Sequence, residues 1–236
     1  MTAAPLLVAE SIGKTFGTRR VLNSASLWVR SGVITVVVGR NGEGKSTLLK
    51  IAAGVLRPDF GTVRYREEHF GRARLANLAS KGVFFLPEHP LLCTSFTVRD
   101  HLMMIQRRFG GGGAADTAVE SLEIGELLDR SPQSLSLGER RRADIALAVA
   151  RRPDCLLADE PFLRITPKDA EAVADVFRAL ATAGCAIALT GHEVPMLFDV
   201  ADEVSWMTAG TTHPLGSPDN AREHHQFGRE YLGIGL

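Results

Sequence analysis

The sequence predicts an α/β protein with a mainly parallel sheet, and three observations support this. Short apolar segments such as 33–38, 155–158 and 185–190 have the pattern of buried strands, and 33–38 is rich in β-branched residues. Segments with apolar residues at helical spacing alternate with them. A glycine-rich loop at 39–44 joins one such strand to one such helix. Strands buried on both faces need helices on both faces, so this alternation predicts a parallel sheet between helical layers.

Composition limits the class of protein. With 236 residues and 45% hydrophobic content, the chain can bury a core and fits one domain. The 27 basic and 27 acidic residues cancel, so no net field attracts nucleic acid or an anionic membrane. The three cysteines show no metal-ligand spacing, which favours a reducing cytoplasm. Without an export signal or a long apolar run, we expect membrane contact only through a partner, with no direct insertion.

The first elements of the chain are predicted to be strands. Residues 6–38 contain short apolar stretches broken by Gly17 and Gly32. A helix begins near Thr47 and ends at Gly54, because glycine is typical of helix ends. Further strands are expected at 61–65 and 83–86.

The middle of the chain is predicted to be helical. Helical spacing dominates from 97 to 147, interrupted by the glycine run 110–113 and by the segment 131–134. The glycine run is expected to be a flexible turn between two helices. The helical stretch is therefore an insertion between strands of the sheet.

Two more helices are expected after this insertion. Thr166 is suited to be an N-cap with Pro167 at the first helical position, and Asp169 is expected to complete a variant capping box. This helix should reach about Ala183. The apolar segment 194–200 predicts a short helix that packs into the core.

A glycine-rich motif gives the strongest functional signal. Gly39-Arg-Asn-Gly-Glu-Gly-Lys-Ser matches G-x-x-x-x-G-K-[ST] between a predicted strand and a predicted helix, which argues against a plain turn with a solvated lysine. Backbone N–H groups and the helix dipole bind phosphate oxygens, the lysine reaches the β- and γ-phosphates, and the serine hydroxyl binds Mg²⁺. The predicted phosphate-binding residues are Gly39, Asn41, Gly42, Gly44, Lys45, Ser46 and Thr47.

A pair of carboxylates follows the buried strand 155–158. In phosphate-loop enzymes one such carboxylate holds Mg²⁺ and the next polarises the attacking water. Asp159 and Glu160 are predicted to play these two roles. Acidic residues after a strand are otherwise common as helix caps or in turns. Their place after an apolar strand, downstream of the phosphate loop, favours the catalytic interpretation.

Three motifs in this order resemble the nucleotide-binding subunits of ATP-binding cassette (ABC) transporters, over essentially all 236 residues. They are the phosphate loop at 39–47, the signature-like Leu135-Ser-Leu-Gly-Glu-Arg-Arg-Arg ahead of Asp159-Glu160, and Thr190-Gly-His192 after a later strand. Within the family, Gly138-Glu-Arg-Arg-Arg, Asp159-Glu-Pro-Phe and Arg229-Glu-Tyr-Leu-Gly are most similar to the lipopolysaccharide-export and branched-chain amino-acid ATPases.

The resemblance implies an architecture for the whole chain. We expect a single domain over 1–236 with a P-loop NTPase core at 1–88 and 151–236. An α-helical subdomain is expected at 89–150. A small antiparallel β portion near the N-terminus should hold Phe16.

The resemblance also implies roles for residues outside the phosphate loop. Phe16 matches the aromatic residue that stacks on adenine, although a core phenylalanine is the alternative. His192 matches the histidine that contacts the γ-phosphate and orients the hydrolytic water. Ser136 and Gly138 match signature residues that reach the ATP of the other subunit, because these ATPases close as head-to-tail dimers around two ATP molecules.

Four positions depart from the family pattern. Glu88 replaces a glutamine near Mg²⁺; its carboxylate can bind the metal but repels the γ-phosphate. Leu137 replaces the first of two signature glycines, whereas Gly138 is retained. Thr166 stands near the position where relatives carry an aspartate that contacts the partner subunit. Gly191 replaces an aspartate found before the histidine in many relatives, and no definite loss follows from it.

The function implied is ATP binding and hydrolysis that power transport through separate membrane subunits. ATP and Mg²⁺ are the expected cofactors, and the partner ATPase is a second copy or another ABC ATPase. The helical subdomain around 88–107 should contact the membrane subunits. The expected location is the cytoplasmic face of the inner membrane, bound peripherally.

Other functions are considered beside this one. A low-turnover switch that dimerises on ATP is favoured by Glu88, Leu137 and Thr166 and opposed by the intact catalytic residues. A cassette for translation or DNA repair usually brings a second cassette or coiled-coil arms, which this sequence lacks. The arginines at 140–142 and 151–152 form a basic cluster that could suggest nucleic-acid contact. The three successive arginines at 140–142 fan out around a helix, however, so we expect a solvated helix start and no nucleic-acid surface.

Overall fold

A six-stranded sheet forms the centre of the molecule in the computed structural model, which describes residues 4–70, 73–110 and 112–233. The strand order is β10-β9-β3-β8-β7-β6, and all neighbours are parallel except β9 and β10. The strands are β3 (Ile34–Val38), β6 (Val83–Leu86), β7 (Cys155–Asp159), β8 (Ala186–Gly191), β9 (Glu203–Thr208) and β10 (Thr211–Gly216). The predicted α/β fold with a mainly parallel sheet is confirmed.

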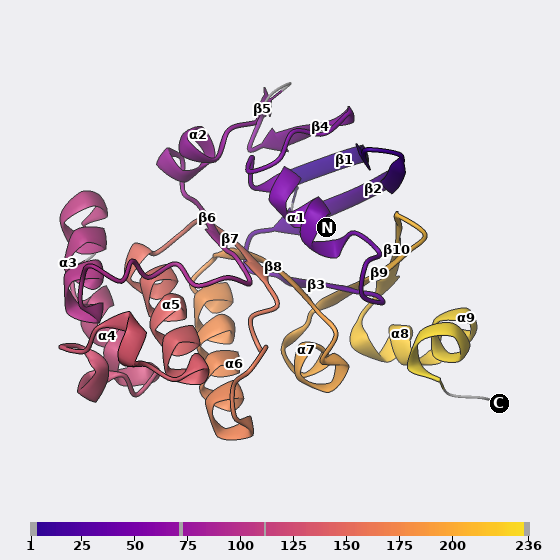
Figure 1. Ribbon diagram of the computed structural model, residues 1–236. Coiled ribbons are helices and arrows are strands. Elements are labelled where there is room, and N and C mark those ends of the chain that lie inside the picture. Colours follow the sequence, from indigo (N-terminus) through magenta and orange to yellow (C-terminus); the bar gives the residue numbers. More distant parts are fainter. Residues whose placement is uncertain (1–3, 71–72, 111, 234–236) are drawn as a thin grey trace.

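A second sheet of four antiparallel strands lies beside the first (Figure 1). Its order is β2-β1-β4-β5, with strands β1 (Pro5–Phe16), β2 (Arg19–Arg30), β4 (Phe60–Tyr65) and β5 (Glu68–Phe70). Phe16 pairs with Arg19 at the end of the β1–β2 hairpin. The antiparallel portion is therefore present and holds Phe16 as expected, whereas β5 was not predicted.

Helix α1 (Lys45–Ala52) lies between the two sheets (Figure 1). It contacts β1 and β2 on one side and β7 and β8 on the other. Its apolar side chains, such as Leu48, Leu49 and Ile51, are buried in a core that also takes in Val37 of β3. This burial fixes the first turn of α1 at the carboxyl end of β3, which is where the phosphate loop must lie.

The helical insertion occupies one end of the molecule (Figure 1). It contains α3 (Val98–Phe109), α4 (Ala114–Ser121) and α5 (Leu137–Arg151), with short 3₁₀ turns at Gly125–Leu127 and Pro132–Ser134. The glycine run links α3 to α4 as predicted, although residue 111 lies outside the described residues. Helix α2 (Leu75–Ser80), which precedes β6, was not predicted.

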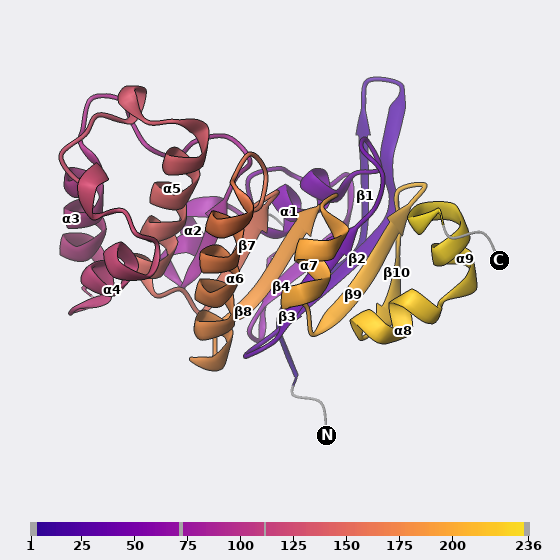
Figure 2. The same cartoon turned by 90° about the horizontal axis from the view of Figure 1, so that it is seen from below.

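Helices α6 (Pro167–Thr182) and α7 (Val194–Val200) cover the face of the six-stranded sheet opposite α1 (Figure 2). The predicted bounds of both helices are confirmed, and Leu197, Phe198 and Val200 of α7 are buried. Beyond β10 the chain adds α8 (Pro218–Glu223), α9 (His225–Phe227) and a π-helical turn, Gly228–Leu232, for which no prediction was made.

Two local predictions were wrong. At the start of α6 the Thr166 hydroxyl accepts a hydrogen bond from the Asp169 backbone N–H, so Thr166 is the N-cap as expected. The Asp169 carboxylate does not close a capping box, because it accepts from the Thr166 hydroxyl and pairs with Arg142. At the start of α5 the three arginines do fan out, yet Arg141 is buried and not solvated. Its guanidinium can be buried because its N–H groups donate to the backbone carbonyls of Pro87, Asp159 and Pro161.

Candidate functional site

The loop between β3 and α1 has the geometry of a phosphate-binding loop. Gly42 and Gly44 have φ values of 85° and 107°, in the left-handed region that favours glycine. A Cβ on Gly44 would lie 2.6 Å from the Leu22 side chain, and one on Gly39 would lie 2.4 Å from the Met207 carbonyl oxygen. The glycines are therefore required by the packing of this chain, independently of any ligand.

Lys45 is buried at the start of α1. Its Nζ donates to the carbonyl oxygens of Gly39 at 2.7 Å and Arg40 at 3.2 Å, so the side chain folds back over the loop. Burial lowers the pKa of Lys45, while the carboxylates of Glu160 and Asp159 act in the opposite direction. A buried ammonium group that donates to neutral carbonyl oxygens is well placed to form a charge-assisted hydrogen bond with a phosphate instead.

Asp159 ends β7 beside the phosphate loop, fully buried. Its Oδ1 accepts hydrogen bonds from the Ser46 hydroxyl at 2.8 Å and the Thr190 hydroxyl at 2.6 Å. Its Oδ2 is also buried and has no hydrogen-bond partner among the described residues. An unpaired carboxylate oxygen next to a serine hydroxyl is the donor set that Mg²⁺ takes in nucleotide sites.

Glu160 and His192 form a second pair at the same edge of the sheet. The Nδ1 atom of His192 lies 3.0 Å from Oε2 of Glu160. Burial raises the pKa of Glu160, and His192 and Lys45 oppose this shift. The backbone of Glu160 has a φ of 49°, and its N–H donates to the Thr190 carbonyl at 3.1 Å. A carboxylate with a raised pKa is a stronger base than an ordinary glutamate.

One cavity of about 560 Å³ brings most of the predicted residues together. Its lining includes residues from the antiparallel sheet, the phosphate loop, the segment after β6 and the ends of β7 and β8. The predicted residues in it are Phe16, Asn41, Gly42, Gly44, Lys45, Ser46, Thr47, Glu88, Glu160 and His192. Asp159 lies beneath it through its bond to Ser46, and Gly39 begins the loop.

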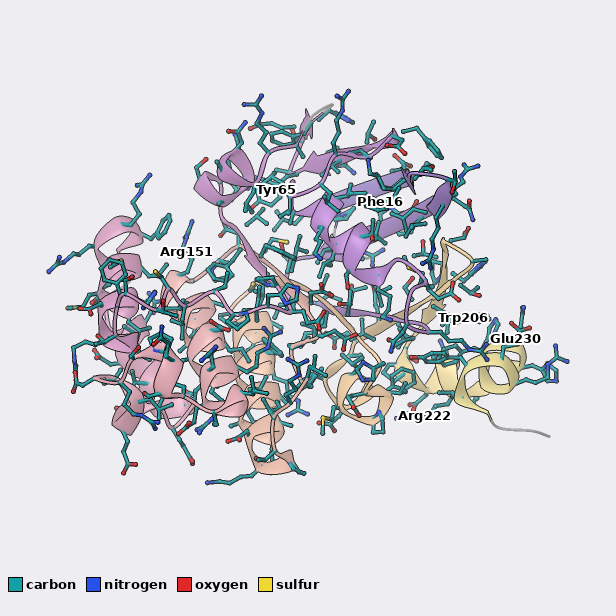
Figure 3. The ribbon with its side chains drawn as sticks, in the orientation of Figure 1. Phe16, Tyr65, Arg151, Trp206, Arg222 and Glu230 are labelled. Atoms are coloured by element: carbon teal, nitrogen blue, oxygen red, sulfur yellow. The ribbon has the colours of Figure 1, made fainter. Side chains whose placement is uncertain are left out.

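Phe16 borders this cavity from the β1–β2 hairpin (Figure 3). Its side chain is 46% exposed, so the alternative of a core phenylalanine is wrong. The Lys14 ammonium lies 5.5 Å from its ring centroid. An exposed ring at the mouth of a phosphate-binding cavity offers a flat face to a base.

Ser136 and Gly138 lie apart from this cavity, at the N-terminus of α5. The Ser136 side chain forms a capping box with Glu139. A Cβ on Gly138 would meet no atom of the described residues closer than 3.5 Å, so glycine is not required there by the fold of the single chain. Leu137 is 55% exposed. These residues do not line the 560 Å³ cavity of their own chain.

Several residues at the cavity were missed by the sequence analysis. Arg19 lines it and donates to the Gly42 carbonyl at 3.2 Å, but a single arginine after a hairpin turn carries no spacing signal. The C-terminal turn also reaches the phosphate loop, on the side where Glu230 and Trp206 lie in Figure 3. Arg40 donates to the Glu230 carbonyl at 2.7 Å, and the Tyr231 hydroxyl donates to the Gly39 carbonyl at 3.4 Å.

A larger cavity of about 820 Å³ lies between α4, α5 and α6. Its lining residues, among them Val149, Val176 and Cys185, belong to none of the motifs. The 560 Å³ cavity is the candidate site because it is lined by Lys45 and Ser46 of the phosphate loop together with Glu160 and His192.

Comparison with known proteins decides the family. The sequence profile described as ABC transporter matches residues 22–163. The chain belongs to the ABC transporter family. It is 31% identical to the lipopolysaccharide export system ATP-binding protein of Haemophilus influenzae, and each chain is covered over 97% of its length. The protein of the same name from Escherichia coli is 30% identical, over 96% of this chain and 97% of the relative.

Solved ABC cassettes have the same fold as this ABC ATPase. A nucleotide-free ATP-binding cassette superposes with a TM-score of 0.84 at 22% identity, covering 98% of this chain and 100% of that one. An ATP-binding cassette in its ADP conformation superposes with a TM-score of 0.83 at 23% identity, with the same coverage. The predicted fold class, including the P-loop core with two sheets and helices, is confirmed.

Family membership also confirms the predicted activity. This ABC ATPase binds and hydrolyses ATP as the nucleotide-binding subunit of a transporter that works with membrane components. Across residues 4–70, 73–110 and 112–233, no helix has the length and apolar character needed to cross a bilayer. In the same residues, no cluster of three or more His, Cys, Asp or Glu side chains is arranged to hold a metal ion.

Proposed function

We propose that this ABC ATPase binds ATP with Mg²⁺ in the 560 Å³ cavity and hydrolyses it there. The observation that carries the proposal is the convergence of Lys45, Ser46, Asp159, Glu160 and His192 on one edge of the parallel sheet. Each residue has a distinct task.

Phosphate binding depends on the loop and on Lys45. The N-terminus of α1 and the loop N–H groups bind the phosphate oxygens, and Lys45 neutralises charge on the β- and γ-phosphates. Ser46 and Asp159 would hold Mg²⁺, because the buried Oδ2 of Asp159 lacks another partner among the described residues. When bound, Mg²⁺ offsets negative charge on the phosphates. Glu88, which lines the same cavity, would be a further ligand.

Hydrolysis depends on Glu160 and His192. Glu160 accepts the proton of the attacking water, because burial raises its pKa and its carboxylate faces the cavity. His192 holds the Glu160 carboxylate through Nδ1 and orients the water against the γ-phosphate. Phe16 stacks on the adenine at the other end of the cavity.

The second half of each site comes from a partner ATPase. Ser136 and Gly138 lie outside the cavity of their own chain, which supports a head-to-tail dimer in which they contact the partner's ATP. The partner is a second copy or another ABC ATPase. We propose that the chain forms a single domain, with a core at 1–88 and 151–236 and a helical subdomain at 89–150.

The helical subdomain supplies the contact with the membrane subunits. Residues 88–107 carry several exposed apolar side chains, which an isolated soluble surface does not require. They are Leu91, Phe96, Met103 and Met104. We place the protein on the cytoplasmic face of the inner membrane through this contact. The membrane subunits, and not this chain, select the transported substrate.

The first prediction tests the site. Lys45→Ala should abolish detectable ATP binding, because the phosphates lose their buried counter-charge. Glu160→Gln should keep ATP affinity within a few-fold of wild type, because the Glu160 carboxylate acts on water during the reaction and not on bound ATP. It should lower turnover by about two to three orders of magnitude. Isothermal titration and steady-state phosphate release measure both. ATP binding by Lys45→Ala at wild-type affinity would show that the cavity is not the nucleotide site.

A low-turnover switch remains the second candidate. Leu137 is the observation that favours it, because this exposed leucine lies between the two residues proposed to contact the partner's ATP. The turnover number of the purified protein separates the two candidates. Transport requires steady hydrolysis that co-purified membrane subunits stimulate, whereas a switch binds ATP and dimerises with little release of phosphate.

A further inference from the structure

Arg141 lies on the buried side of α5 and reaches toward the catalytic edge of the sheet. Its side chain is 6% exposed. The guanidinium donates three hydrogen bonds to backbone carbonyls: Nη1 to Pro87 at 2.7 Å, Nη2 to Asp159 at 2.7 Å and Nε to Pro161 at 3.2 Å. One side chain thus connects α5 to the segments that follow β6 and β7.

These three carbonyls flank the acidic residues of the site. The Asp159 and Pro161 carbonyls lie on either side of Glu160, and the Pro87 carbonyl directly precedes Glu88. Arg141 therefore holds the backbone next to the proposed base and next to the carboxylate at the rim of the cavity.

The Glu160 backbone needs such support. Its φ of 49° is unusual for a residue with a side chain. The following Pro161 restricts the Glu160 backbone further, because a residue before proline favours the extended region. Strain of this kind persists only where the surrounding structure fixes the backbone. The two bonds from Arg141 to the flanking carbonyls, together with the bond from the Glu160 N–H to Thr190, fix it here.

The adjacent turn of α5 holds the other end of the segment that contains Glu88. Oδ1 of Asp144 accepts from the N–H groups of Leu91 and Leu92 at 3.0 Å and 3.3 Å. Arg141 and Asp144 thus hold residues 87 and 91–92, on both sides of Glu88. Because α5 begins at the signature motif, one rigid helix connects the partner-facing surface to the catalytic backbone.

We propose that Arg141 is a positioning residue for ATP hydrolysis, which sets the orientation of the Glu160 carboxylate by holding the carbonyls of Asp159 and Pro161. The proposal rests on the role of Glu160 as the base. It assigns to Arg141 no contact with ATP. Lysine cannot replace it, because a single ammonium lacks the planar fork that satisfies carbonyls in three directions.

The test compares Arg141→Lys with Arg151→Lys in the 236-residue protein. Arg151 is the matched control, because it lies on the same helix, outside the signature motif, and donates to the carbonyl of Ala79, away from the cavity. We expect Arg141→Lys to lower kcat by about tenfold to a hundredfold, as a small misplacement of a catalytic group does. The KM for ATP and the Kd for ATP should stay within twofold. Arg151→Lys should keep both kcat and KM.

A double-mutant cycle separates positioning from general packing. In the Glu160→Gln background, Arg141→Lys should cause little further loss of turnover, because the group that it positions is already gone. Equal loss in both backgrounds would overturn the proposal. A wild-type kcat for Arg141→Lys, or a rise in Kd with kcat unchanged, would also overturn it.

Two further results keep the test decisive. If Arg141→Lys shows no thermal unfolding transition and is therefore not folded, Arg141→Gln takes its place. If neither variant folds, Arg141 has a structural role and the proposal is overturned. If Glu160→Gln itself turns over at the wild-type rate, the proposed base is wrong, whatever Arg141 does. The two failures are thus distinguishable.

Discussion

At the scale of single residues, the site combines buried charges of both signs in a small space. Lys45 and Asp159 are buried, and Glu160 has a raised pKa at the cavity wall. Such an arrangement is costly in a folded protein unless a ligand compensates it. In the proposed function, triphosphate and metal ion would together supply that compensation, so the buried charges that destabilise the empty fold would also give the site its affinity.

Phe16 tests the adenine end of the cavity. Phe16→Ala should weaken ATP binding by about 1–2 kcal/mol, because a stacked base is lost. The melting temperature should change little, since the ring is 46% exposed and contributes little to the core. Isothermal titration and thermal unfolding measure the two quantities. A large fall in melting temperature with unchanged affinity would contradict the stacking role.

We expect Asp144 to make the free energy of unfolding depend on pH. Burial raises its pKa from 3.8 to about 6, against the opposing effect of the Leu91 N–H bond and of Arg141. Because the folded pKa is raised, the folded protein holds this proton more tightly. Its contribution to stability is therefore full below about pH 4 and is lost as pH rises through about 6.

We therefore expect Asp144→Asn to flatten this part of the stability curve. The wild-type free energy of unfolding should lose about 2 kcal/mol between pH 4 and 6.5 through this group, and the variant should lack that loss. Urea unfolding at the two pH values, with Asp169→Asn as a control on a more exposed carboxylate, measures the difference. Identical pH dependence in wild type and Asp144→Asn would refute the assignment.

At the scale of elements, strong local patterns were sufficient for prediction. The apolar strands β3, β7 and β8, the glycine loop and the capped helix α6 were all predicted from short segments of sequence. Each has a signal in its own residues: an apolar run for the strands, the G-x-x-x-x-G-K-[ST] pattern for the loop, and a Thr-Pro start for α6. Together these elements place Lys45, Asp159 and Glu160, so the core of the candidate site was predictable.

Elements without a strong local pattern were missed. Strand β5 is three residues long and mostly polar, and it exists because it pairs with β4. Helices α8 and α9 form where Ala221 and Phe227 bury their side chains, and Phe227 stacks on Phe198 and Tyr231. Arg141 was misjudged for the same reason: its carbonyl partners come from distant segments, so only the tertiary structure reveals its burial.

At the scale of the whole molecule, the departures from the family pattern lie mainly on one surface. Leu137 and Thr166 begin α5 and α6, on the side proposed to face the partner's ATP, whereas Lys45, Asp159 and His192 serve the chain's own ATP. A homodimer would carry the departures in both sites and should hydrolyse slowly. A heterodimer with an ordinary relative would have one active and one persistent site.

The prediction that follows concerns turnover of the homodimer. The double substitution Leu137→Gly and Thr166→Asp should raise kcat several-fold. The reason is that a glycine-rich signature and a charged side chain would then contact the partner's ATP. Thr166→Asp keeps an N-cap for α6, so stability should be retained. Steady-state phosphate release from the two proteins decides the matter. Equal or lower activity in the restored protein would mean that the donated surface is not defective.

We expect ATP bound in this cavity to close two cassettes around it, and the oligomeric state of Glu160→Gln is the sharpest test. Glu160→Gln with ATP and Mg²⁺ should elute as a dimer in size-exclusion chromatography with light scattering, with one ATP retained per chain. The same protein with ADP, and the double variant Lys45→Ala with Glu160→Gln in ATP, should elute as monomers. A Glu160→Gln protein that remains monomeric while ATP is bound would contradict the account.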